Sequence, residues 1–173
     1  MKYNKIIIAT HWIIALLFAL LFLSDYLRSI SDKGTEIRVL WLNLHSWFGI
    51  MVFVLTIIRL AVKMNSKAPA AVYEKGVMQL LLHGAHISLY LITLLVPISG
   101  YIRFAGKGGR SLTIAGETMP SLVDKSEWLF NLGKATHGDV MESIILIVIV
   151  GHIAAALYHQ LIIKDKVMSR ILP

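Results

Sequence analysis

The 173-residue chain contains no cysteine, and this absence excludes several classes of metal and redox protein. Without thiolates it has no disulfide, no iron–sulfur cluster and no zinc ribbon. The C-x-x-C-H motif that attaches c-type haem covalently is also missing. A metal or haem bound by this chain must therefore be held by His, Met or carboxylate side chains.

Charged residues are also scarce, at 16% of the chain, whereas hydrophobic residues make up 57%. Soluble domains contain about 25% charged residues. The 17 Lys and Arg outnumber the 10 Asp and Glu, which gives a net charge of +7. Such a charge alone would suggest a nucleic-acid binder, but so apolar a chain needs lipid as its solvent. We therefore expect a membrane protein with no nucleic-acid partner.

Four apolar stretches reach the length of about 20 residues that a membrane-spanning helix needs. They are hydrophobic all round, which is typical of membrane helices rather than of amphipathic ones. The first stretch is longer than the apolar core of a signal peptide, so we interpret it as a retained helix. The sequence predicts an all-α integral membrane four-helix bundle, one domain over residues 1–173, with spans at about 6–27, 39–62, 76–102 and 136–163.

An even number of spans places both termini on one side of the membrane. That side carries nine Lys and Arg against two acidic residues, and the other side carries eight against eight. Because positive charge is concentrated on the cytoplasmic side, both termini are predicted to be cytoplasmic. The long 103–135 segment is then an outer loop, rich in glycine, with a short amphipathic piece at Trp128–Phe130.

Seven histidines all lie within or at the edges of the four predicted spans. They are His11, His45, His83, His86, His137, His152 and His159. Ionisable side chains in a membrane span are costly and by default mark function. A single histidine can simply bond to a neighbouring helix, but seven together favour a cofactor site.

The depths of four histidines suit two haems stacked across the bilayer. His152 follows His137 by 15 residues, or about 22 Å along a helix, so the last span has one histidine in each half of the membrane. His11 and His45 lie in opposite halves too. Haem iron takes two axial ligands from facing helices, which predicts the pairs His11 with His152 and His45 with His137. Spacing alone leaves His152 and His159 as alternatives for the inner ligand.

Two glycines lie beside predicted ligands: Gly49 is one turn after His45, and Gly151 precedes His152. They leave room for a macrocycle. The surplus histidines His83, His86 and His159 lie at one level near the inner haem. Imidazoles can hydrogen-bond to both carbonyl oxygens of a quinone and supply protons. The alternative is that they form interhelical hydrogen bonds, or that one of them is a haem ligand.

Over nearly its whole length the sequence resembles the bacterial cytochrome b561 family, small di-haem b proteins of the inner membrane. The motifs that carry the resemblance are His11-Trp12, Leu44-His45-x-x-Phe48-Gly49, Ile58-Arg59-Leu60, His86-x3-Tyr90, Pro97-x-x-Gly100, His137-Gly138 and the run from His152 to Tyr158-His159. The ligand layout of related hydrogenase and formate dehydrogenase subunits implies His152 as the inner ligand, and leaves His159 for the quinone. Where relatives can carry a Lys, this chain has His83.

The resemblance further implies a superoxide oxidase, in which electrons pass from superoxide at the outer haem to ubiquinone at the inner one. Basic residues on the outer side can attract a small anion; they are Arg38, Arg103, Lys107 and Arg110. The alternative is an ordinary solvated loop. We predict a superoxide:ubiquinone oxidoreductase with two non-covalent haems b. One rival is an electron-transfer subunit of a periplasmic dehydrogenase or hydrogenase. A metal transporter is disfavoured by the small number of helices and the lack of mid-span acids.

Overall fold

The computed structural model describes residues 2–67, 76–108, 112–114, 117–119, 121–165 and 167–173. Its elements in chain order are α1 (Lys5–Ile30), α2 (Glu36–Met64), α3 (Val77–Lys107), β1 (Leu112–Ile114), β2 (Glu117–Met119), α4 (Glu127–Thr136), α5 (Asp139–Tyr158), a π-helical turn (His159–Ile163) and a 3₁₀ turn (Met168–Arg170).

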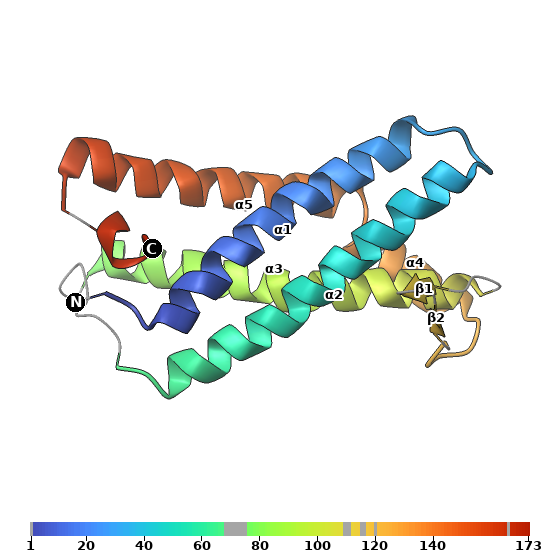
Figure 1. Cartoon of the computed structure of the whole chain (residues 1–173), viewed down its shortest axis with the longest axis horizontal. Helices are drawn as coiled ribbons and strands as arrows, with labels where there is room; N and C mark the ends of the chain where they lie inside the picture. The colour runs from blue at the N-terminus through green and yellow to red at the C-terminus, as the bar shows by residue number, and fades with distance from the viewer. Residues whose placement is uncertain (1, 68–75, 109–111, 115–116, 120, 166) are drawn as a thin grey trace.

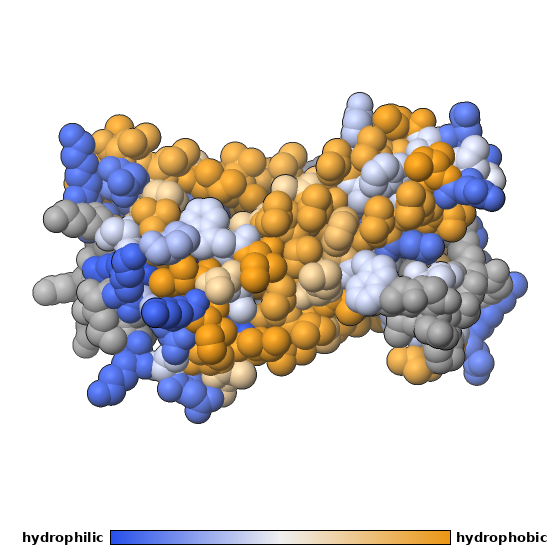
Figure 2. Space-filling model, in the orientation of Figure 1, coloured by the Kyte–Doolittle hydropathy of each residue, from blue (hydrophilic) through white to orange (hydrophobic). Residues whose placement is uncertain are grey.

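Among the described residues, four segments are long and apolar enough to cross a membrane, which confirms the predicted bundle. They are Lys5–Ile30, Glu36–Met64, Gln79–Lys107 and Glu127–Ile163. Helices suit this environment because each satisfies its own backbone hydrogen bonds where no water can. Figure 2 shows an apolar band across the middle of the molecule and hydrophilic residues at both ends. Both termini lie at the same end (Figure 1), as the even number of spans requires.

The first three helices extend beyond the predicted apolar runs. α1 begins where the Asn4 side chain accepts a hydrogen bond of 2.8 Å from the backbone N–H of Ile6, the usual role of an N-cap. α2 gains a first turn with Glu36, and α3 a last turn with Lys107. Acidic residues at a helix start and basic residues at its end interact favourably with the helix dipole, so these polar residues continue the helices.

The prediction of a loop over residues 103–135 was wrong in part. Among its described residues, β1 and β2 form a short antiparallel hairpin, and Trp128–Phe130 lies within a separate helix, α4. The side chain of Ser126 caps α4 by accepting a hydrogen bond from Leu129 N–H. The last span was predicted to start at about residue 136, and α5 begins three residues later, at Asp139.

The break between α4 and α5 falls at His137 and Gly138. The backbone of Gly138 is extended, and that of His137 is non-helical, with φ of −142° and ψ of 60°. A side chain on Gly138 would place its Cβ 2.7 Å from the carbonyl oxygen of Lys134, so glycine permits this close passage. As a result, His137 is not the first residue of a helix. It is held in a two-residue connection between two helices.

The helices pack as two close pairs, α1 with α2, which run side by side (Figure 1), and α3 with α4. Among the first three helices, α5 packs most against α3. Small side chains permit the close approaches. A Cβ on Gly133 of α4 would lie 2.4 Å from the backbone nitrogen of Arg103 in α3. The largest fully buried side chains, Ser24, Val52 and Thr56, lie on α1 and α2. Small residues at interhelical contacts are characteristic of membrane bundles, where dispersion and hydrogen bonds drive association.

Candidate functional site

His45 of α2 and His137 form the outer pair, with ring centroids 6.1 Å apart and ring planes at 87°. Metal–imidazole bonds are about 2 Å long, and the nitrogen is about 1 Å from the ring centre, so two imidazoles on opposite sides of one iron have centroids roughly 6 Å apart. The outer pair therefore has the separation of two axial haem ligands.

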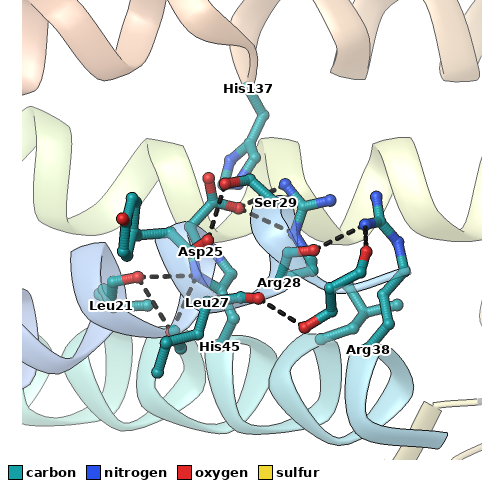
Figure 3. Close-up of polar contacts among 12 residues, drawn as sticks. Leu21, Asp25, Leu27, Arg28, Ser29, Arg38, His45 and His137 are labelled. Atoms are coloured by element: carbon teal, nitrogen blue, oxygen red, sulfur yellow. Dashed lines mark hydrogen bonds and ion pairs between the residues drawn. The ribbon is translucent and has the colours of Figure 1, made fainter. Parts of the chain in front are cut away.

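Backbone carbonyls orient both rings of the outer pair. Nδ1 of His45 donates to the carbonyl oxygen of Leu21 (3.2 Å), and Nδ1 of His137 donates to that of Val96 (2.9 Å). A carbonyl can only accept, so each Nδ1 carries the proton and each Nε2 keeps a lone pair for a metal. Figure 3 shows His137 pointing from its connection toward the helices that carry His45 and Asp25.

Glycines adjust the space around the outer pair in two different ways. A Cβ on Gly100 of α3 would lie 2.8 Å from Cε1 of His137, so only glycine leaves the ring its position. A Cβ added to Gly49, one turn after His45, would have no atom within 4 Å, so the space beside it is open. The donor set, the separation and the open space beside Gly49 together fit a haem.

His11 of α1 and His152 of α5 form the inner pair, with ring centroids 6.2 Å apart. A Cβ added to Gly151 would also have no atom within 4 Å. With this open space and the ring separation, the inner pair fits a haem as well. The ring of His86 on α3 is also close enough to share an iron with His152, since their centroids are 6.0 Å apart. Within the described chain, neither His11 nor His152 makes a hydrogen bond through its ring, whereas Nδ1 of His86 bonds to the carbonyl of Leu82 (2.7 Å).

The surplus histidines differ in burial. His83 and His86 are exposed on α3, and Nδ1 of His83 bonds to the carbonyl oxygen of Gln79 one turn earlier. His159 is buried in the π-helical turn, and its Nδ1 bonds to Asp165 (2.5 Å). The structure thus brings His86 to the inner pair and gives His159 a carboxylate partner. The distance of 6.2 Å between the ring centroids of His11 and His152 favours His152 over His159 as the inner ligand.

Comparison with known proteins identifies the family. The family model of the prokaryotic cytochrome b561 matches residues 2–173. The chain belongs to the prokaryotic cytochrome b561 family. Cytochrome b561 homolog 1 of Escherichia coli (strain K12) is 30% identical over 173 residues, covering 99% of this chain and 97% of the relative. The probable superoxide oxidase CybB of Yersinia pestis is 28% identical over 174 residues, covering 99% and 96%.

As a cytochrome b561, the chain is a membrane electron-transfer protein and an oxidoreductase of a family that binds b-type haem. Its four spanning helices and its prokaryotic family indicate a bacterial membrane protein. Among the described side chains, the histidine pairs His45–His137, His11–His152 and His86–His152 have both the chemistry and the separation to ligate such a haem.

The basic residues predicted to steer an anion also have roles in this cytochrome's fold. Arg103 donates from Nη1 to the carbonyl oxygen of His137, and Arg38 donates from Nη1 to those of Arg28 (2.6 Å) and Ser31 (2.7 Å) (Figure 3). The Lys107 side chain is exposed, with its ammonium 6.0 Å from the centre of the Phe130 ring. Arg110 lies outside the described residues.

Sequence reasoning missed the proximity of three charged residues to the histidine pairs. Asp25 and Arg28 form an ion pair (2.6 Å) near enough to interact electrostatically with the outer pair. The spacing Asp25-x-x-Arg28 on one helix face was the available signal. Arg59 acts in the same way on the inner pair and donates to the carbonyl oxygen of Ile7. This hydrogen bond joins α1 to α2, and no local sequence pattern predicts it.

Proposed function

We propose that this single-domain protein is a di-haem b oxidoreductase of the bacterial inner membrane, with both termini cytoplasmic. It takes electrons from superoxide at the periplasmic end and delivers them to ubiquinone. The observation that carries the proposal is the presence of two histidine pairs at different depths, each with the ring separation that one iron requires. Two such sites provide a route for electrons across the bilayer.

Each pair has a defined task in this proposal. His45 and His137 hold the outer haem by Nε2, with their Nδ1 protons fixed on the carbonyls of Leu21 and Val96. His11 and His152 hold the inner haem. When bound, haem b supplies reversible one-electron chemistry, while the protein sets position and potential.

Superoxide as donor is supported by charge and by a relative. Arg38, Arg103 and Lys107 lie at the end opposite the termini, and local positive charge raises the encounter rate of a small anion. Hydrogen bonds from Arg38 and Arg103 to carbonyl oxygens leave both guanidinium groups charged. The Yersinia pestis relative is named a probable superoxide oxidase.

Quinone reduction is assigned to the end that carries the termini. His83 and His86 on α3 and the buried His159 supply donors there for the two carbonyl oxygens of ubiquinone. The reaction balances as two superoxide ions, one ubiquinone and two protons giving two dioxygen molecules and one ubiquinol. Each superoxide is oxidised by one electron, and the quinone is reduced by two.

A second function is favoured by a specific surface. Leu122 and Trp128, on the segment between α3 and α5, have relative exposures of 80% and 69%. Exposed apolar residues near one end of the bundle suit a docked protein partner. The alternative is therefore an electron-transfer subunit that receives electrons from a periplasmic dehydrogenase or hydrogenase.

The deciding experiment uses the purified full-length protein. We expect a b-type reduced spectrum with about two haems per chain, rapid haem reduction by a superoxide pulse, and reoxidation by added ubiquinone. A colourless preparation would exclude the redox function. Haem that responds only to a co-purified dehydrogenase, and not to superoxide, would establish the subunit function instead.

A further inference from the structure

The end of the last span pairs a buried imidazole with a carboxylate from beyond the helix. His159 is 8% exposed, and its Nδ1 lies 2.5 Å from Oδ2 of Asp165. Residues six positions apart lie on different faces of an α-helix, since each residue turns the chain by about 100°. Here the π-helical turn ends at Ile163, and the next residue, Lys164, is in the left-handed conformation with φ of 57°. The N–H of Lys164 donates to the carbonyl oxygen of His159 (2.7 Å). This change of chain direction brings the Asp165 carboxylate next to the His159 ring.

Asp165 is held in place by its own segment and by the N-terminus. Its Oδ1 accepts a hydrogen bond from Val167 N–H (3.1 Å). Further along, the carbonyl of Arg170 accepts from Tyr3 N–H (3.1 Å), and that of Ile171 accepts from the Trp12 indole (2.9 Å). These contacts fasten the C-terminal segment across the start of α1, so the carboxylate is positioned by tertiary structure.

Asp165 is the more exposed member of the pair, and His159 is the more buried one. The Asp165 side chain is 22% exposed and the His159 side chain 10%, and the last span ends at Ile163, before the carboxylate. Partial desolvation acts to raise the pKa of Asp165. The hydrogen bonds from His159 and Val167 outweigh that effect and lower the pKa below its usual value. Asp165 is therefore an anion at neutral pH and accepts the Nδ1 proton of His159.

We propose that Asp165 is the positioning residue for proton delivery to the quinone, orienting His159 through Nδ1 and stabilising its protonated form. This inference rests on the proposed function. Reduction of one ubiquinone needs two electrons, which two superoxide ions supply, and two protons. For each proton, an N–H bond at Nε2 of His159 breaks and an O–H bond on the quinone forms. Water at the end with the termini then reprotonates the imidazole, and Asp165 stays ionised throughout, as the carboxylate does beside other catalytic histidines.

The test compares Asp165→Asn, Asp165→Glu and wild-type protein, all full-length and purified with haem. Asparagine can still accept the Nδ1 hydrogen bond but carries no charge. Asp124→Asn is the matched control, because Asp124 is an exposed carboxylate at the opposite end of the bundle. The measurements are haem content, the rate of haem reduction by a superoxide pulse without quinone, and kcat and KM for a short-chain ubiquinone in H2O and in D2O.

For Asp165→Asn we expect wild-type haem content and wild-type haem reduction by superoxide. We expect kcat for ubiquinone to fall at least about tenfold, with little change in KM and a larger solvent isotope effect. Asp165→Glu should restore most of kcat, and Asp124→Asn should match wild type.

Three outcomes would overturn the inference. A wild-type kcat in Asp165→Asn would show that the charge has no role. Equal losses of haem or of haem reduction in the Asn and Glu variants would show a purely structural role. Wild-type protein that accepts electrons from superoxide but cannot reduce ubiquinone would refute the proposed function, and the inference with it, before any variant is compared.

Discussion

The two histidine pairs have nearly the same ring separation but very different surroundings. In the outer pair, both Nδ1 atoms bond to carbonyls of other helices, and Gly100 makes space for the His137 ring. In the inner pair, neither ring makes a hydrogen bond within the described chain, and His86 lies as close to His152 as His11 does. Hydrogen bonds behind a ligating histidine set its tautomer and its orientation. Backbone carbonyls therefore orient both outer rings, whereas no hydrogen bond within the described chain orients the inner rings.

The strongest test of this comparison removes one outer ligand. His137→Ala should bind about half the wild-type haem, because an iron deprived of one imidazole loses half of its axial coordination. Haem extraction with quantification per chain, together with the reduced spectrum, measures this. Thr136→Ala changes the preceding residue and should keep both haems. An unchanged haem content in His137→Ala would remove the outer pair from the assignment.

The second test asks which ring shares the inner iron with His152. We expect His11→Ala to lose one haem, and His86→Ala to keep both while ubiquinone reduction slows. His159→Ala should likewise keep both haems and lose quinone activity, whereas His152→Ala should lose a haem. The same haem assay with steady-state quinone kinetics separates these results. Loss of a haem in His86→Ala but not in His11→Ala would reverse the assignment.

A smaller effect is expected from Gly100→Ala, which places a methyl group against the His137 ring. Overpacking of this kind costs about 1–3 kcal/mol, and the cost should fall on the outer site alone. The expected result is a shifted or weakened outer haem signal and a lower denaturation midpoint. Gly84→Ala on the same helix is the control, since nothing lies within 4 Å of its Cβ. Equal effects of the two substitutions would contradict a specific role for Gly100.

Most of the fold and part of the site followed from the sequence. Hydrophobic length identified the four spans, and depth predicted the pair of His45 with His137. Depth left His152 and His159 as alternatives beside His11, and the family resemblance implied His152. The pairs His45–His137 and His11–His152 both have the ring separation of haem ligands. The prediction for residues 103–135 was less accurate, because α4 is short and because the break between α4 and α5 depends on the close approach of Gly138 to the Lys134 carbonyl. A contact of that kind leaves no periodic signal.

The sequence by itself determined the number of spans, their approximate limits and the depth of each histidine. These properties are local, since they depend only on side-chain hydropathy and on the fixed rise of a helix. The tertiary structure alone decided that His86 reaches His152, that Arg103 binds the His137 carbonyl and that Asp165 returns to His159. Those contacts depend on how the helices approach one another and on how one helix ends, and neither property is encoded in the spacing of residues along a single span.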